Sequence, residues 1–92
     1  MQVKVANRLY KMSRKEYQGL LQVASEQVPF GVYAVEKGDY AELRNDRCKS
    51  MSQLKAMTRQ FKSQGFRVLS NKGQALREAG AEAAEGALMS AT

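Results

Sequence analysis

The chain has 92 residues, of which 43% are apolar, enough for one small packed domain and too few for two. It has one cysteine, Cys48, and no histidine, so a single chain can form neither a zinc site of Cys and His ligands nor an internal disulfide. Because it needs no oxidising compartment and has no segment of signal-peptide or membrane-spanning length, we expect a cytoplasmic protein with no membrane partner.

The net charge of +6 is unevenly distributed. Residues 1–72 carry 14 Lys or Arg against 6 Asp or Glu, whereas residues 73–92 carry one arginine and three glutamates. We expect residues 1–72 to form a single basic α+β domain. Residues 73–92 are rich in Ala, Gly and Glu, and Gly80 and Gly86 would each cost a helix interior about 1 kcal/mol, so we expect a frayed helix or a disordered tail.

The first part of the chain predicts one strand or a short hairpin over residues 3–12, with Asn7 near a turn. Ser13 stands three residues before Glu16, the spacing of a capping box, so a helix should begin there. Pro29 should end this helix near Gln27. Its apolar positions follow helical spacing and predict one buried stripe: Tyr17, Leu20, Leu21 and Ala24.

Residues 30–44 alternate with the period of a strand and predict a hairpin that turns at Lys37 and Gly38. One face of this hairpin should carry Phe30, Val32, Ala34, Ala41 and Leu43. The other face should carry Tyr33, Val35, Tyr40, Glu42 and Arg44.

A second capping pattern, Ser50 with Gln53, predicts a second helix that ends near Gly65, and residues 66–70 predict a closing strand. The expected fold class is α+β: an antiparallel sheet of four to five strands with two helices packed on one face. The leading arrangement is ferredoxin-like β-α-β-β-α-β, with or without an extra N-terminal strand, followed by an Ala/Gly-rich C-terminal helix or tail.

The sequence offers few side chains suited to catalysis. Without histidine, acid–base chemistry would depend on carboxylates, Lys, Tyr or Cys48, and Glu36 and Asp39 flank a turn, where such residues are usually solvated. Neither G-x-G-x-x-G nor G-x-x-x-x-G-K-[ST] occurs. We therefore expect a protein that is not an enzyme and has no catalytic residues, no cofactor and no metal site.

The main candidate site is a basic stripe on the second helix. Lys55, Arg59 and Lys62 recur at i, i+4 and i+7, which places them along one helix face. No Asp or Glu occurs between Arg47 and Lys72 to pair with them locally. Such a stripe could follow successive phosphates, and the alternative interpretation is an ordinary solvated helix surface.

A second candidate set lies on the predicted sheet. Tyr33 and Tyr40 would lie beside Arg44 and Arg67 on the face opposite the helices, where aromatic rings and cations can stack unpaired bases. The alternative is that these tyrosines serve strand packing alone.

The sequence therefore favours a small non-catalytic module that binds nucleic acid through the basic helix and the sheet tyrosines. A protein-binding adaptor or inhibitor that docks on an acidic protein surface of a larger complex remains an alternative, a role suited to accessory proteins of phages or mobile elements. A homodimer formed through an exposed edge strand and the tyrosine-bearing sheet face is a third hypothesis.

Overall fold

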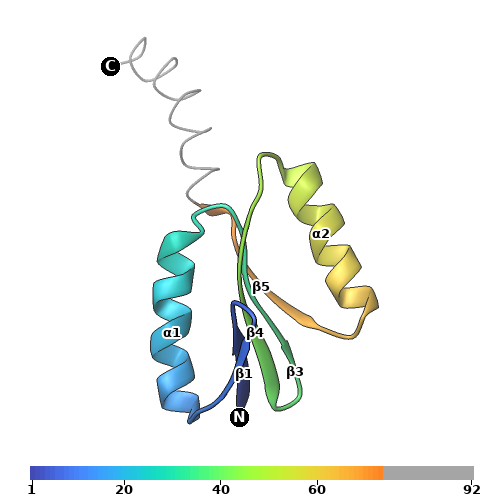
Figure 1. Ribbon diagram of the computed structural model, residues 1–92. Coiled ribbons are helices and arrows are strands. Elements are labelled where there is room, and N and C mark those ends of the chain that lie inside the picture. Colours follow the sequence, from blue (N-terminus) through green and yellow to red (C-terminus); the bar gives the residue numbers. More distant parts are fainter. Residues whose placement is uncertain (74–92) are drawn as a thin grey trace, which may run out of the picture.

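The computed structural model describes residues 1–73, so the expectation for the C-terminal tail concerns residues outside the described part. Five strands and two helices follow one another as β-β-α-β-β-α-β (Figure 1). Their bounds are β1 Gln2–Val5, β2 Arg8–Lys11, α1 Arg14–Gln27, β3 Gly31–Lys37, β4 Tyr40–Arg47, α2 Met51–Ser63 and β5 Arg67–Asn71. The predicted α+β class is confirmed, and the N-terminal segment is a hairpin.

Both helices begin at the predicted caps. The Ser13 hydroxyl accepts a hydrogen bond from the Glu16 amide at 3.1 Å, and the Glu16 carboxylate accepts one from the Ser13 amide at 3.3 Å. Ser50 caps α2 in the same way, because its hydroxyl accepts from the Gln53 amide at 3.1 Å. These bonds satisfy backbone donors that a helix start would otherwise leave unpaired.

The sheet is mixed, with strand order β2-β1-β4-β3-β5. β1 runs parallel to β4, whereas the other neighbouring pairs are antiparallel. The prediction of an antiparallel sheet is therefore wrong in this respect. The ferredoxin-like order is also wrong, because it would place the closing strand beside the N-terminal strands, whereas β5 pairs with β3 at the other end of the sheet.

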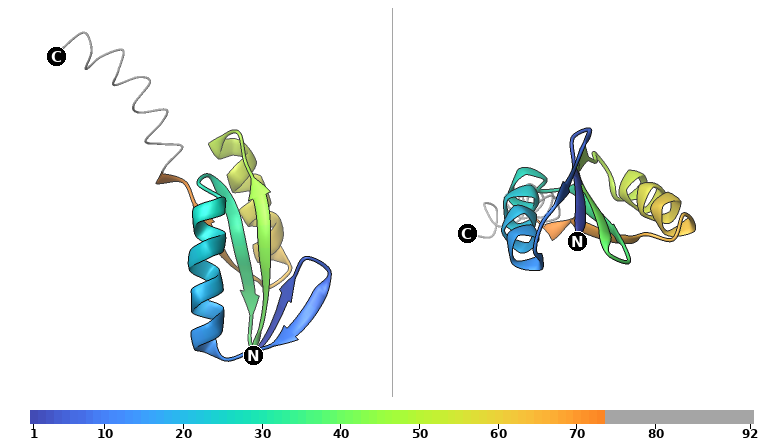
Figure 2. Two further views of the ribbon diagram at one scale, coloured as in Figure 1. Left: turned by 60° about the vertical axis from the view of Figure 1, so that its left-hand side comes forward. Right: turned by 60° about the horizontal axis from the view of Figure 1, so that its bottom comes forward.

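The two helices cover opposite faces of the sheet, with α1 on one side and α2 on the other (Figure 2). The prediction that both pack on one face is wrong, and the reason is the direction of the crossovers. β2 connects through α1 to β3, and β4 connects through α2 to β5, so both connections move the same way across the sheet. β2 and β4 point in opposite directions, so two right-handed crossovers must place their helices on opposite faces.

Two small cores result, one beneath each helix. A bulge between Val32 and Ala34 keeps Val32 and Val35 on the α2 side, whereas Ala34 lies opposite Leu43 on the α1 side. The buried residues of the α2 core are Phe30, Val32, Val35, Cys48 and Leu54, and those of the α1 core are Val3, Tyr17 and Ala41.

The β3–β4 hairpin turns one residue later than predicted. Lys37 pairs with Tyr40, so the two turn residues are Gly38 and Asp39. Gly38 has φ 59° and takes the first turn position, where a type II′ turn requires glycine. The shift keeps Tyr40 on the same face as Val35, as predicted, whereas the bulge places Phe30, Val32 and Tyr33 on the faces opposite those expected.

Candidate polyanion-binding groove

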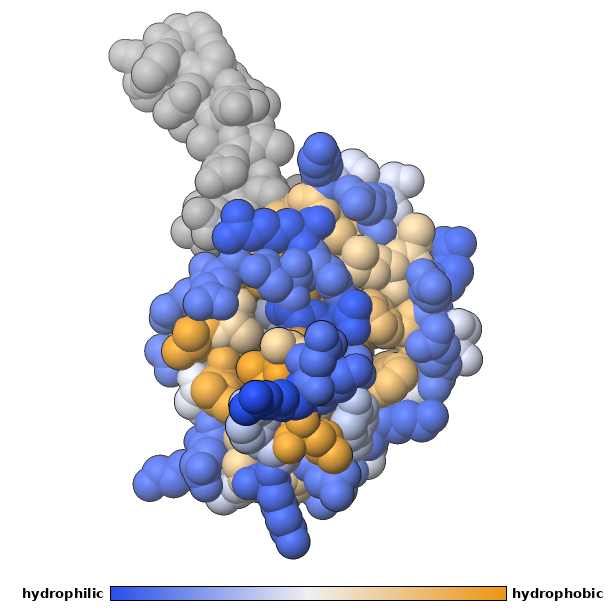
Figure 3. All heavy atoms as spheres, in the orientation of Figure 1, coloured by the Kyte–Doolittle hydropathy of each residue, from blue (hydrophilic) through white to orange (hydrophobic). Residues whose placement is uncertain are grey.

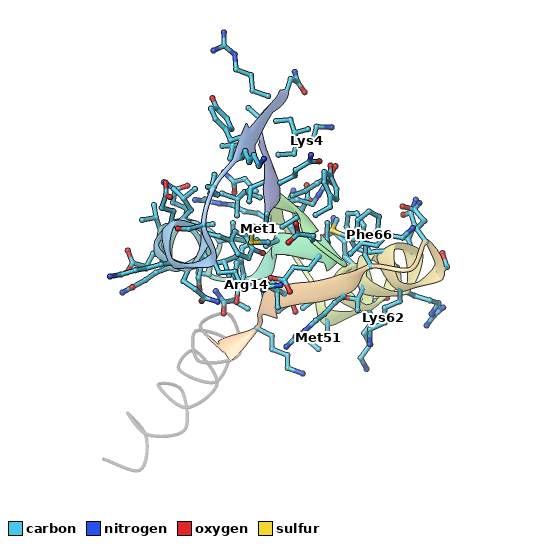
Figure 4. All side chains as sticks on the ribbon, turned by 90° about the horizontal axis from the view of Figure 1, so that it is seen from below. Met1, Lys4, Arg14, Met51, Lys62 and Phe66 are labelled. Carbon is cyan, nitrogen blue, oxygen red and sulfur yellow. The ribbon has the colours of Figure 1, made fainter. Side chains whose placement is uncertain are left out.

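A groove of about 530 Å³ lies between α2 and β5, at the end of the sheet where β5 is the last strand. Its apolar lining is Met51 and Leu54 from α2 and Val68 from β5. Figure 4 shows Met51 and Lys62 beside β5, and Figure 3 shows hydrophilic side chains on the outer side of α2 with apolar ones between α2 and the sheet. Four cations line the groove: Lys55, Arg59, Lys62 and Lys72.

The position of the three α2 cations follows from the helix itself. Leu54 points into the core, with 3% of its surface exposed, and the next residue, Lys55, begins the exposed stripe that continues through Arg59 and Lys62. The salt bridges of residues 1–73 involve other cations: the N-terminus, Lys4 and Arg44. The structure places these three cations along one groove, and no carboxylate of residues 1–73 forms a salt bridge with them.

Lys72 was not predicted as a site residue. It follows β5 directly, and β5 reaches the groove because Ser70 pairs with Val32 of β3. This pairing is a long-range feature with no local signal in the sequence. The outer edge of β5 has no strand partner within residues 1–73, so its backbone groups lie beside the four cations without a ladder on that side.

Arg44 and Tyr40 lie on the same face as α2 but within a charge network of their own. Glu42 receives hydrogen bonds from the Tyr40 hydroxyl at 2.7 Å and from Arg44 at 3.1 Å, and Lys4 approaches it to 3.6 Å. Arg44 also pairs with Asp46. The guanidinium is thus neutralised within the sheet and does not add to the basic groove.

The ionisation of this network follows from its contacts. The hydrogen bond from Tyr40 has the largest effect and lowers the pKa of Glu42; burial, the next largest effect, opposes it, and the charges of Lys4 and Arg44 lower the pKa further. Burial, followed by the hydrogen bond to Glu42, raises the pKa of Tyr40 to about 12. Glu42 is therefore ionised and Tyr40 protonated at neutral pH.

Tyr33 and Arg67 lie apart from this network. Arg67 stands opposite Glu36, on the α1 face of the sheet. Tyr33 occupies the bulge of β3 and is close enough to Tyr17 of α1 to contribute to the raised pKa of that phenol. The prediction that Tyr33, Tyr40, Arg44 and Arg67 share one open face is therefore wrong.

The single thiol is a core group. Cys48 is 8% exposed, and burial, followed by the nearby Asp46, raises the pKa of its thiol. Arg47 and Lys49 flank Cys48 in the sequence, but its side chain packs inward with Leu54 in the α2 core. Low thiolate content makes Cys48 a poor nucleophile.

Residues 1–73 show neither a metal-binding cluster nor a membrane-spanning helix. They contain no group of three or more His, Cys, Asp or Glu side chains arranged to hold a metal ion. Neither α1 nor α2 has the length and apolar composition that crossing a membrane requires.

Comparison with known proteins yields no match: no family model, no curated protein and no solved structure is significantly similar to the chain.

Proposed function

We propose that the protein binds a polyanion, in the first instance nucleic acid, through the groove between α2 and β5, and that it does so without catalysis. The observation that carries the proposal is the gathering of Lys55, Arg59, Lys62 and Lys72 around one groove, where no carboxylate of residues 1–73 neutralises them. With a rise of about 1.5 Å per residue, the three α2 cations spread over roughly 10 Å and can meet more than one phosphate.

This groove favours contact with the phosphate backbone over the reading of bases. None of its lining residues is aromatic, and the cations are lysines and one arginine. Phosphate contacts position a protein on nucleic acid and carry no sequence information. The proposed binding is therefore sequence-independent and strongly dependent on salt.

A salt titration tests the proposal. Fluorescence polarisation with labelled single- and double-stranded oligonucleotides should give a straight line of log affinity against log salt. Four phosphate contacts predict a slope of roughly −3.5 on duplex DNA. Arg59→Ala should weaken binding and reduce the slope by about one. The matched control is Lys15→Ala, which removes an exposed cation of α1 on the opposite face and should leave the slope unchanged.

Two results would oppose the proposal. The first is no binding of any DNA or RNA at low salt. The second is an equal loss of affinity in the Lys15 and Arg59 variants, which would assign binding to net charge rather than to the groove.

An acidic protein segment is the second candidate ligand. The apolar floor formed by Met51, Leu54 and Val68 favours it, because phosphates make no use of an apolar floor whereas a helix with both acidic and apolar residues would. Affinity capture from the native host after nuclease treatment separates the two candidates. A single protein that is retained by the wild type and lost with Arg59→Glu would support a protein ligand, whereas recovery of nucleic acid alone would oppose it.

A further inference from the structure

Strand β4 extends beyond the strand on one of its sides, and this leaves a notch in the sheet. β3 pairs with β4 along its length, whereas β1 pairs with β4 only as far as Glu42. The hairpin of β1 and β2 turns back at residues 6–7, and β4 continues past this turn (Figure 2). On the β1 side, residues 43–47 of β4 therefore have no strand partner within residues 1–73. Such an edge offers backbone donors and acceptors to an extended chain.

A cavity opens on each face of the sheet at this notch. The two cavities share four lining residues: Ala6, Leu43, Arg44 and Asn45. The cavity on the α1 side has a volume of about 380 Å³, and that on the α2 side has a volume of about 280 Å³. Successive side chains of a strand point to opposite faces of a sheet. A chain that pairs with β4 at the notch would therefore place side chains in both cavities.

The α1-side cavity is apolar and incompletely filled. Val23 is 50% exposed and Leu20 is 36% exposed, and both line this cavity from α1. Val5 of β1 and Leu43 of β4 line it from the sheet. Figure 3 shows apolar side chains at the surface between α1 and the N-terminal hairpin. An apolar side chain that enters the cavity would remove this surface from water.

Arginines stand at both ends of the α1-side cavity. Arg8 lies directly opposite Val5 in the hairpin, so both side chains project from the same face. At the other end, Arg47 donates to the carbonyl oxygen of Gln27 at 2.8 Å. Neither arginine forms a salt bridge with a carboxylate of residues 1–73. Charge complementarity therefore favours an acidic side chain on each side of the apolar one.

The charges of the α2-side cavity balance each other, because Lys4 and Arg44 pair with Glu42 and Asp46. A neutral polar side chain therefore suits this side. We propose that an extended segment of a partner protein adds to the sheet as a strand beside β4 at the notch. Its pattern is acidic, polar, apolar, polar, acidic, with the apolar side chain in the α1-side cavity. This site does not depend on the groove between α2 and β5.

An NMR titration of the isotope-labelled full-length protein tests the proposal. The probe is the synthetic peptide Ser-Asp-Ser-Leu-Ser-Asp-Ser, which reads the same in both directions and so fits either strand orientation. Amide signals of residues 43–47 and 20–27 should shift, and hydrogen exchange at residues 43–47 should slow because the new strand pairs with their backbone. Serine in place of the peptide leucine should weaken binding by about tenfold or more, since the buried apolar side chain is lost.

Substitutions in the protein locate the site. Val23→Glu places a carboxylate in the α1-side cavity and should abolish binding, whereas Gln22→Glu adds the same charge to the exposed surface of α1 outside the cavity and should retain it. Arg47→Gln should weaken binding of the peptide by up to about fivefold. It should not change binding of a peptide with asparagine in place of both aspartates. An amide spectrum with wild-type dispersion shows that each variant is folded.

Four results would overturn the proposal. The first is no binding at millimolar peptide, and the second is equal binding by the Val23→Glu and Gln22→Glu variants. The third is a set of shifts confined to α2 and β5, which would assign the peptide to the basic groove and leave the proposed function intact. The fourth is a sedimentation mass of two chains that falls to one only in Val23→Glu, which would show that a second copy of the protein fills the notch.

Discussion

Replacing Tyr17 by phenylalanine isolates one buried hydrogen bond that joins α1 to the sheet. Tyr17 is 1% exposed, and its hydroxyl donates to the carboxylate of Glu36 at 2.6 Å. The substitution keeps the ring and leaves the packing of the α1 core in place. It removes only a hydrogen bond to a carboxylate, a kind of bond that contributes about 1.5–3 kcal/mol.

The expected loss in the free energy of unfolding is about 2 kcal/mol, because Glu36 is half-buried and water can replace only part of the lost bond. Tyr40→Phe is the matched control, since Tyr40 makes the same kind of bond to Glu42 at 2.7 Å. Glu42 retains Lys4 and Arg44 as partners when Tyr40 is changed, so this variant should lose less than about 1 kcal/mol.

Urea denaturation followed by circular dichroism at neutral pH measures both variants, and repeating it at alkaline pH adds a second readout. Burial, followed by the bond to Glu36, raises the pKa of Tyr17 above its ordinary value near 10. The unfolded chain then releases this proton above about pH 10 while the folded chain retains it, so stability is complete below pH 10 and falls as the pH rises. Wild type should lose up to about 1.4 kcal/mol per pH unit more than Tyr17→Phe. Equal losses in the two phenylalanine variants, or the same alkaline slope in wild type and Tyr17→Phe, would refute the reasoning.

Two further substitution pairs probe the fold by the same urea assay. A Cβ at Gly31, which has φ 149°, would lie 2.0 Å from the Asp46 carbonyl oxygen, so Gly31→Ala should lower the free energy of unfolding by more than about 3 kcal/mol. A Cβ at Gly19 on α1 would meet nothing within 4 Å, so Gly19→Ala should raise the free energy of unfolding by about 0.5–1 kcal/mol. Changes of the same sign would contradict this contrast. Leu54 is 3% exposed, so Leu54→Ala should lower the free energy of unfolding by about 3 kcal/mol. Leu20 is 36% exposed, so Leu20→Ala should lower it by less than about 1 kcal/mol. Equal losses would show that the α2 core is misplaced.

The local features of the fold could be predicted because each depends on neighbouring residues. Ser13 and Ser50 cap their helices through side chains that reach backbone amides three positions on. Gly65 follows α2 with φ 89°, a left-handed conformation that glycine adopts without strain. Each of these signals lies within four residues of the boundary that it sets.

The topology could not be predicted in the same way, because it depends on which strands pair across long stretches of chain. Nothing local distinguishes a β5 that pairs with β3 from one that pairs with an N-terminal strand. The apolar run from Val32 to Val35 does carry a signal, because such a run is typical of a strand buried on both faces, which requires a helix on each side. The bulge at Tyr33 had no signal.

The residues of the candidate site also differ in whether local sequence or long-range strand pairing brings them together. Helical spacing alone brings Lys55, Arg59 and Lys62 together, whereas Lys72 joins them only through the pairing of β5. The neutralised state of Arg44 had a signal, because Glu42 and Asp46 stand two residues to either side of it and share its strand face. A cation flanked in this way is already satisfied within its own strand.

The position of strand β3 has a consequence for how the protein unfolds. Its neighbours in the sheet are β4 and β5; its Val32 and Val35 belong to the cluster beneath α2, and its Glu36 accepts a hydrogen bond from Tyr17 of the cluster beneath α1. Neither half can lose its packing while the other keeps a complete β3, so thermal unfolding should be a single cooperative transition despite the two separate clusters. A destabilising substitution in either cluster should therefore lower the free energy of unfolding of the whole domain.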